Sequence, residues 1–108
     1  MKVVFLRADY KPCPDDEAPV RFGFECPRKP GYICSGLLIA GAKLADGTVI
    51  KQHPDGKKPH CWEWNGSRTA PTFTPSINCL AHAPNNPADK YGGCGWHGHI
   101  TNGKHTGA

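Results

Sequence analysis

The sequence of 108 residues has no long apolar run. Its first apolar stretch, Val3-Val-Phe-Leu6, is interrupted at once by Arg7, Asp9 and Lys11. A secretory signal needs an apolar region of about 7–15 residues, and a membrane-spanning helix needs about 20. We therefore expect a soluble protein that does not insert into membranes and that stays in the cytoplasm.

Dense basic runs are also missing. The formal net charge is +4, but Arg28-Lys29 and Lys57-Lys58 are the only adjacent pairs of cations. Proteins that bind nucleic acids typically carry a denser basic stripe. We therefore do not expect DNA or RNA as a binding partner.

Long helices are disfavoured as well, because the chain contains 13 glycines and 11 prolines. Phe22 and Phe24 alternate with other residues in Arg21–Glu25, which is the period of a half-buried strand. Four dipeptides supply the positive φ angles of tight hairpin turns: Asp46-Gly47, Asp55-Gly56, Asn65-Gly66 and Asn102-Gly103. The sequence predicts one domain over residues 1–108, mainly β, with a small antiparallel sheet, a hairpin meander, long loops and a zinc site.

Several segments of this domain can be placed individually. Val3–Leu6, Arg21–Glu25 and Ser35–Ala40 read as strands, because they are rich in β-branched, aromatic or aliphatic residues. Trp62 and Trp64 share one face of their segment, and a small sheet needs such large side chains to fill its core. Residues 83–93 form a polar loop that is long for a hairpin connection, so we expect it to contact a substrate or a partner.

The six cysteines indicate metal binding, redox chemistry or buried thiols in a reducing compartment. Cys79-x-x-His82 and Cys94-x-x-His97 have the short spacing of structural zinc ligands. Cys26 and Cys34 flank a Pro/Gly turn and add two further candidates. Two ligand sets are open: Cys79, His82, Cys94 and His97, or else Cys26, Cys34, Cys79 and Cys94, which leaves His97 for catalysis. Cys13 and Cys61 are expected to be buried thiols.

A serine and a histidine form the second candidate site. If residues 71–82 and 93–100 pair as antiparallel strands with Cys79 opposite Cys94, then Ser76 lies opposite His97. Side chains directly opposite on such strands have Cβ atoms about 4.5–5.5 Å apart. A serine hydroxyl becomes a useful nucleophile when a base lies within hydrogen-bond reach. No Gly-x-Ser-x-Gly elbow is present, and Glu63 and Asp89 are candidates for a third, orienting group.

Four motifs together resemble a known family: Phe24-x-Cys26-Pro27, Trp62-x-Trp64-Asn-Gly66, Pro71-Thr-Phe-Thr-Pro-Ser-Ile77, and Cys94-Gly-Trp-His-Gly-His-Ile100 followed by Asn102-Gly103. They resemble small phage and prophage proteins of unknown function, some of which carry the unsupported label ammonia monooxygenase. Related members occur in bacterial ubiquitin-like conjugation operons and look like peptidases that remove the modifier. The resemblance covers about residues 22–103.

This resemblance implies that Ser76 and His97 form a Ser–His catalytic pair and that Cys26 and Cys94 are metal ligands. It implies a phage-associated, peptidase-like hydrolase in the cytoplasm of a bacterial host, acting on conjugates of a ubiquitin-like modifier. Many relatives have a tighter Cys-Pro-x-Cys motif, so the role of Cys34 is open. The main alternative is a non-catalytic zinc-binding module that contacts another protein. In a third interpretation, zinc is the catalyst and His97 is one of its ligands.

Overall fold

The computed structural model describes residues 2–28, 31–51, 61–78, 81–84, 91–92 and 96–107. These residues form β-strands, turns and loops, and none of them is helical. The strands are β1 (Val3–Leu6), β2 (Arg21–Glu25), β3 (Tyr32–Leu38), β4 (Glu63–Trp64), β5 (Phe73–Asn78), β6 (Ala81–Pro84), β7 (Tyr91–Gly92), β8 (His97–Thr101) and β9 (Lys104–Gly107).

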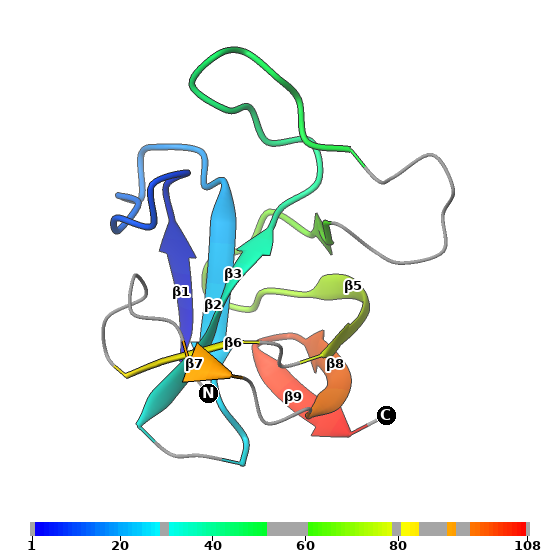
Figure 1. The fold of residues 1–108 in the computed structure, drawn as a ribbon. Helices are drawn as coiled ribbons and strands as arrows, with labels where there is room; N and C mark the ends of the chain where they lie inside the picture. The colour runs from blue at the N-terminus through cyan, green and yellow to red at the C-terminus, as the bar shows by residue number, and fades with distance from the viewer. Residues whose placement is uncertain are drawn as a thin grey trace.

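The strands divide between two antiparallel sheets, which Figure 1 shows side by side. The first sheet has the order β1-β2-β3-β6-β7, and the second has the order β4-β5-β8-β9. The chain passes from the second sheet into the first between β5 and β6, and it returns between β7 and β8. The mainly β, antiparallel architecture is as predicted. The predicted hairpin meander in one sheet is wrong, because the strands form two sheets and the chain changes sheets twice after β5.

Two strand predictions are confirmed at their full length, Val3–Leu6 and Arg21–Glu25. The predicted strand Ser35–Ala40 is displaced, since β3 begins at Tyr32 and ends at Leu38. Part of the predicted Pro/Gly turn before it is therefore strand, and Cys34 lies inside β3. Part of the predicted loop at 83–93 also pairs, because β6 and β7 form an antiparallel ladder; residues 85–90 lie outside the described part of the chain.

Aromatic side chains from both sheets form the core. Phe22 of β2 and Phe73 of β5 stack across the interface with ring centroids 3.7 Å apart. Trp62 packs edge-on against Phe22 with a centroid distance of 6.2 Å, and Trp64 packs against Phe5 at 5.0 Å. Full burial of a side chain of this size contributes roughly 1.5–3 kcal/mol. The prediction that Trp62 and Trp64 belong to the core is confirmed, with Trp62 buried and Trp64 partly buried.

The turn between β8 and β9 has the predicted chemistry. Asn102 and Gly103 have φ angles of 51° and 77°, the conformation that a two-residue hairpin turn requires at both central positions. This turn brings β9 back along β8 over four paired positions. The Asp55-Gly56 turn lies outside the described residues.

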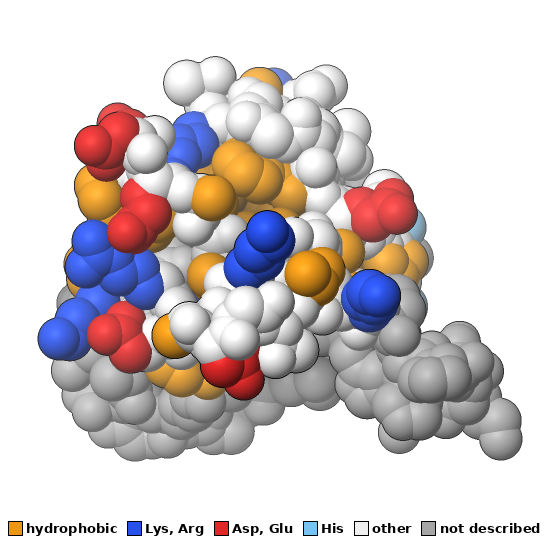
Figure 2. Space-filling view, turned by 90° about the horizontal axis from the view of Figure 1, so that it is seen from above, with side chains coloured by type: hydrophobic (Ala, Val, Ile, Leu, Met, Phe, Trp, Pro, Cys, Tyr) orange, Lys and Arg blue, Asp and Glu red, His pale blue; other side chains and the backbone are white. Residues whose placement is uncertain are grey.

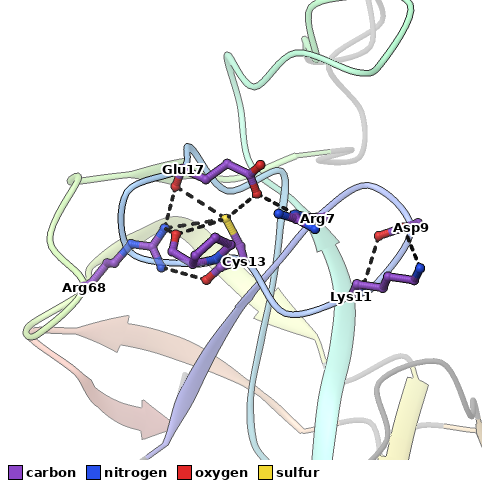
Figure 3. A network of polar contacts seen from close by, with 7 residues as sticks. Arg7, Asp9, Lys11, Cys13, Glu17 and Arg68 are labelled. Atoms are coloured by element: carbon purple, nitrogen blue, oxygen red, sulfur yellow. Dashed lines mark hydrogen bonds and ion pairs between the residues drawn. The ribbon is translucent and has the colours of Figure 1, made fainter.

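Arg68 ties the loop between β1 and β2 to the loop between β4 and β5 (Figure 3). Its guanidinium donates to the carbonyl oxygens of Glu17 at 2.6 Å and Pro14 at 3.0 Å, while Arg7 donates to the Glu17 carboxylate at 2.6 Å. These bonds place positive charge beside the Glu17 carboxylate and lower its pKa, with the hydrogen bond from Arg7 as the main cause. The β1–β2 loop is thereby fixed against the second sheet.

Charges of both signs are interspersed on the face shown in Figure 2, where Lys and Arg side chains alternate with Asp and Glu around apolar atoms. Within the described ranges, the chain contains no helix long and apolar enough to cross a membrane.

Candidate active site

Ser76 and His97 lie in contact on the outer face of the second sheet. The Oγ atom of Ser76 is 2.8 Å from Nε2 of His97. Ser76 is half-buried in β5 and His97 is exposed in β8. When the neutral imidazole carries its proton on Nδ1, the serine hydroxyl donates to Nε2, which is the arrangement a general base needs. The contact expected from the sequence is therefore present.

The strand register that produces this contact differs from the predicted one. Phe73 pairs with Ile100, which matches the predicted register, but Ile77 pairs with Gly98 and Asn78 with His97. The ladder thus slips by two residues between Phe73 and Ile77. Asn78, not Ser76, lies directly opposite His97, and Ser76 reaches the imidazole diagonally.

The slip occurs at an irregular segment of β5 that contains Thr74, Pro75 and Ser76. Because side chains alternate between the two faces of a strand, a shift of two residues keeps Ser76 and His97 on the same face. The Thr74–Pro75 peptide bond in this segment is cis. Proline inside a sheet is found at bulges and edges, so Pro75 in a central strand was the sequence signal for the irregularity.

The residues behind the pair are tightly packed. Ile77 and Ile100 are fully buried under the outer face. Gly98 follows His97 and faces inward against the ring of Trp96. Tightly packed side chains therefore support the two strands from beneath, while Ser76 Oγ and His97 Nε2 lie on the outer face of the sheet.

The sequence offered Glu63 and Asp89 as groups that could orient His97. Glu63 lies opposite Thr74 in β4, and no hydrogen bond joins it to His97 in the described part of the molecule; Asp89 lies outside the described residues. The sequence analysis did not single out Asn78 as a neighbour of the Ser–His pair. Asn78 lies opposite His97 in the ladder and follows Ser76 by two residues, so the alternation of side chains along a strand was the signal that could have placed it on the same face.

The candidate metal ligands are only partly described. Cys26 and Cys34 are buried, at 2% and 1% exposure, and Cys34 is disulfide-bonded in this structure. The backbone of His82 lies opposite Cys34 in the ladder between β3 and β6. Cys79 and Cys94 lie outside the described residues. Across the residues that the structure describes, no three His, Cys, Asp or Glu side chains form a group that could hold a metal.

Cys13 and Cys61 are buried, as the sequence predicts. Burial raises the pKa of the Cys61 thiol, and the negative charge of Glu63 adds to the effect. Because the thiolate is the reactive form, a raised pKa slows alkylation at neutral pH.

We therefore expect the folded protein to alkylate slowly with iodoacetamide at Cys61 at pH 7. The rate should rise with pH to beyond the usual range of thiol ionisation, and denaturation in urea should remove the protection. Peptide mass spectrometry measures the rate, with Cys61→Ser identifying the peptide. Equal alkylation rates in buffer and in urea would contradict the prediction.

A family model described as bacterial ubiquitination-like system serine protease (BubE) matches residues 44–107. The match includes Ser76 and His97 and begins after Cys26 and Cys34. No curated protein and no solved structure matches the chain.

Proposed function

Because the chain belongs to the family of bacterial ubiquitination-like system serine proteases, we propose that it is a serine peptidase that removes a ubiquitin-like modifier from its conjugates. The observation that carries this proposal is the 2.8 Å contact between Ser76 Oγ and His97 Nε2. A hydroxyl and an imidazole at this distance form the nucleophile and base of acyl-transfer chemistry.

The reaction follows from this geometry. Ser76 Oγ attacks the scissile carbonyl carbon while its proton passes to His97 Nε2. The tetrahedral intermediate collapses when the bond to the leaving nitrogen or oxygen breaks, and His97 returns the proton to that leaving group. Water, deprotonated by His97, then attacks the acyl-serine ester and releases a carboxylate and the regenerated serine.

The position of the pair favours a protein substrate. His97 and His99 are both exposed on the outer face of β8, and Ser76 lies beside them on β5. Small-molecule sites usually enclose most of their ligand. A sheet face open to solvent instead accommodates an extended segment that protrudes from a folded protein.

A fluorophosphonate probe tests the proposal. It reacts with a serine only when a base activates the hydroxyl, so we expect covalent labelling of the native protein and none after denaturation. Peptide mass spectrometry should place the adduct on Ser76. If the native protein instead resists labelling and fails to cleave a fusion protein that carries the ubiquitin-like modifier, the non-catalytic binding module is the better interpretation.

We further propose that Cys26, Cys34, Cys79 and Cys94 hold a structural zinc ion. Support comes from the first two. Phe24 lies opposite Cys34, and Cys26 follows Phe24 by two residues, so both cysteine side chains lie on the same buried face. Thiolates are preferred ligands of structural zinc, and Cys34 would serve as one in its reduced state. A bound zinc would stabilise the fold by coupling ligation to folding.

We expect protein purified under reducing conditions to contain about one zinc ion per chain, and Cys26→Ser to lower that content. Elemental analysis by mass spectrometry measures both. If the protein contains no metal and a chelator leaves its melting temperature unchanged, the structural zinc is excluded. That result would not affect the proposed chemistry of Ser76 and His97.

A further inference from the structure

The main-chain carbonyl of Ser76 accepts a hydrogen bond from a side chain. The indole Nε1 of Trp62 donates a hydrogen bond to this oxygen at 3.1 Å. Ser76 belongs to the irregular segment of β5, where the ladder with β8 is interrupted between Phe73 and Ile77. Regular strand pairing cannot fix the backbone in such a segment, so a side-chain donor takes over that role.

Trp62 is itself held on several sides. Its main-chain N–H donates to the Leu38 carbonyl at 2.9 Å, and its main-chain carbonyl accepts from the Ala40 N–H at 2.8 Å. The residue is 6% exposed, and its ring packs edge-on against Phe22. The indole N–H is therefore a fixed donor, anchored to the segment at the end of β3.

We propose that Trp62 is a positioning residue for the nucleophile: its indole N–H holds the Ser76 carbonyl and so sets the distance from Ser76 Oγ to His97 Nε2. This inference rests on the proposed function. Misplacement of a reacting group by about 1 Å can cost about 100-fold in rate. The Ser76 carbonyl carbon is bonded to the Cα atom that carries Cβ and Oγ, so a shift of the main chain at Ser76 would carry Oγ with it.

The chain offers a matched control. Trp64 Nε1 donates to the main-chain carbonyl of Ser67 at 2.9 Å, in the loop between β4 and β5. Trp62→Phe and Trp64→Phe each remove one indole donor to a serine carbonyl and leave an aromatic ring in the core. Trp62 is more deeply buried than Trp64, so Trp62→Phe should cost more stability than Trp64→Phe. Only Trp62→Phe removes a hydrogen bond at the nucleophile.

The test compares the rate of fluorophosphonate labelling and the imidazole ¹⁵N chemical shifts of His97 in wild type and both variants. We expect Trp62→Phe to slow labelling by about 10- to 100-fold and to shift the His97 Nε2 resonance. Trp64→Phe should label within about twofold of wild type and leave that resonance in place. Melting temperatures verify that all three proteins are folded.

Equal labelling and equal His97 spectra in the two variants would overturn the inference. A wild type that is not labelled would overturn the proposed function instead, and the ¹⁵N shifts would still test whether Trp62 positions Ser76 against His97. If Trp62→Phe does not fold, benzothienylalanine at position 62 replaces the N–H by sulfur in a ring of the same shape. With that residue, slower labelling supports the inference and unchanged labelling overturns it.

Discussion

Ser76→Ala will abolish fluorophosphonate labelling and the cleavage of a fusion protein that carries the ubiquitin-like modifier, and His97→Gln will slow both by about 10³-fold. The serine oxygen forms the covalent bond, so its loss removes the reaction path. Loss of the base leaves a hydroxyl with its ordinary low nucleophilicity, and general-base catalysis is typically worth about 10²–10⁴-fold. Rates are measured as the time course of labelling and of product formation on a gel.

These two substitutions should leave the fold intact. His97 is exposed and Ser76 is half-buried, and a hydrogen bond of this kind contributes only about 0.5–1.5 kcal/mol. The matched control is His99→Gln, because His99 lies on the same face of the same strand and pairs with Thr106. It should retain activity within about threefold. If Ser76→Ala is labelled as fast as wild type, the nucleophile is another residue.

Gly98→Ala will unfold the protein or lower its free energy of unfolding by about 3 kcal/mol. A Cβ atom at this position would overlap the carbonyl oxygen of Thr106 and the ring of Trp96, whose Cη2 atom would lie 2.9 Å away. Neither neighbour can move freely. Thr106 belongs to the ladder of β9, and Trp96 is 7% exposed and packs against Phe24 with a centroid distance of 5.5 Å.

Gly107 provides the control for this prediction. It lies directly opposite Gly98 in the ladder between β8 and β9, yet an added Cβ there would have no atom within 4 Å. Gly107→Ala should therefore change the free energy of unfolding by less than about 1 kcal/mol. Urea denaturation followed by tryptophan fluorescence measures both variants. Similar midpoints for the two would show that the packing under β8 is looser than the structure indicates.

The sequence predicted those features that depend on local pattern. Val3–Leu6 and Arg21–Glu25 formed strands as expected because their side chains alternate or are β-branched. Asn102-Gly103 formed its turn because that dipeptide tolerates positive φ at both positions. The resemblance to peptidases of ubiquitin-like conjugation operons was likewise confirmed by the family match.

Features that depend on contacts between distant residues were harder to predict. The division into two sheets is decided by pairings such as that of β3 with β6. The residue pattern of either strand alone does not indicate which strand it pairs with. The contact between Ser76 and His97 was predicted through a register that holds at Phe73 and fails at Ile77. The prediction succeeded because an even slip preserves the face on which a side chain lies.

The path of the chain between β5 and β8 has a consequence for how such a protein can diversify. The two strands that carry Ser76 and His97 are held in register by their own ladder, while the segment joining them contributes β6 and β7 to the other sheet. Insertions or deletions in that segment need not change the spacing of the two reactive atoms. Under the proposed function, substrate preference can therefore change through the length and composition of this segment without displacing Ser76 or His97.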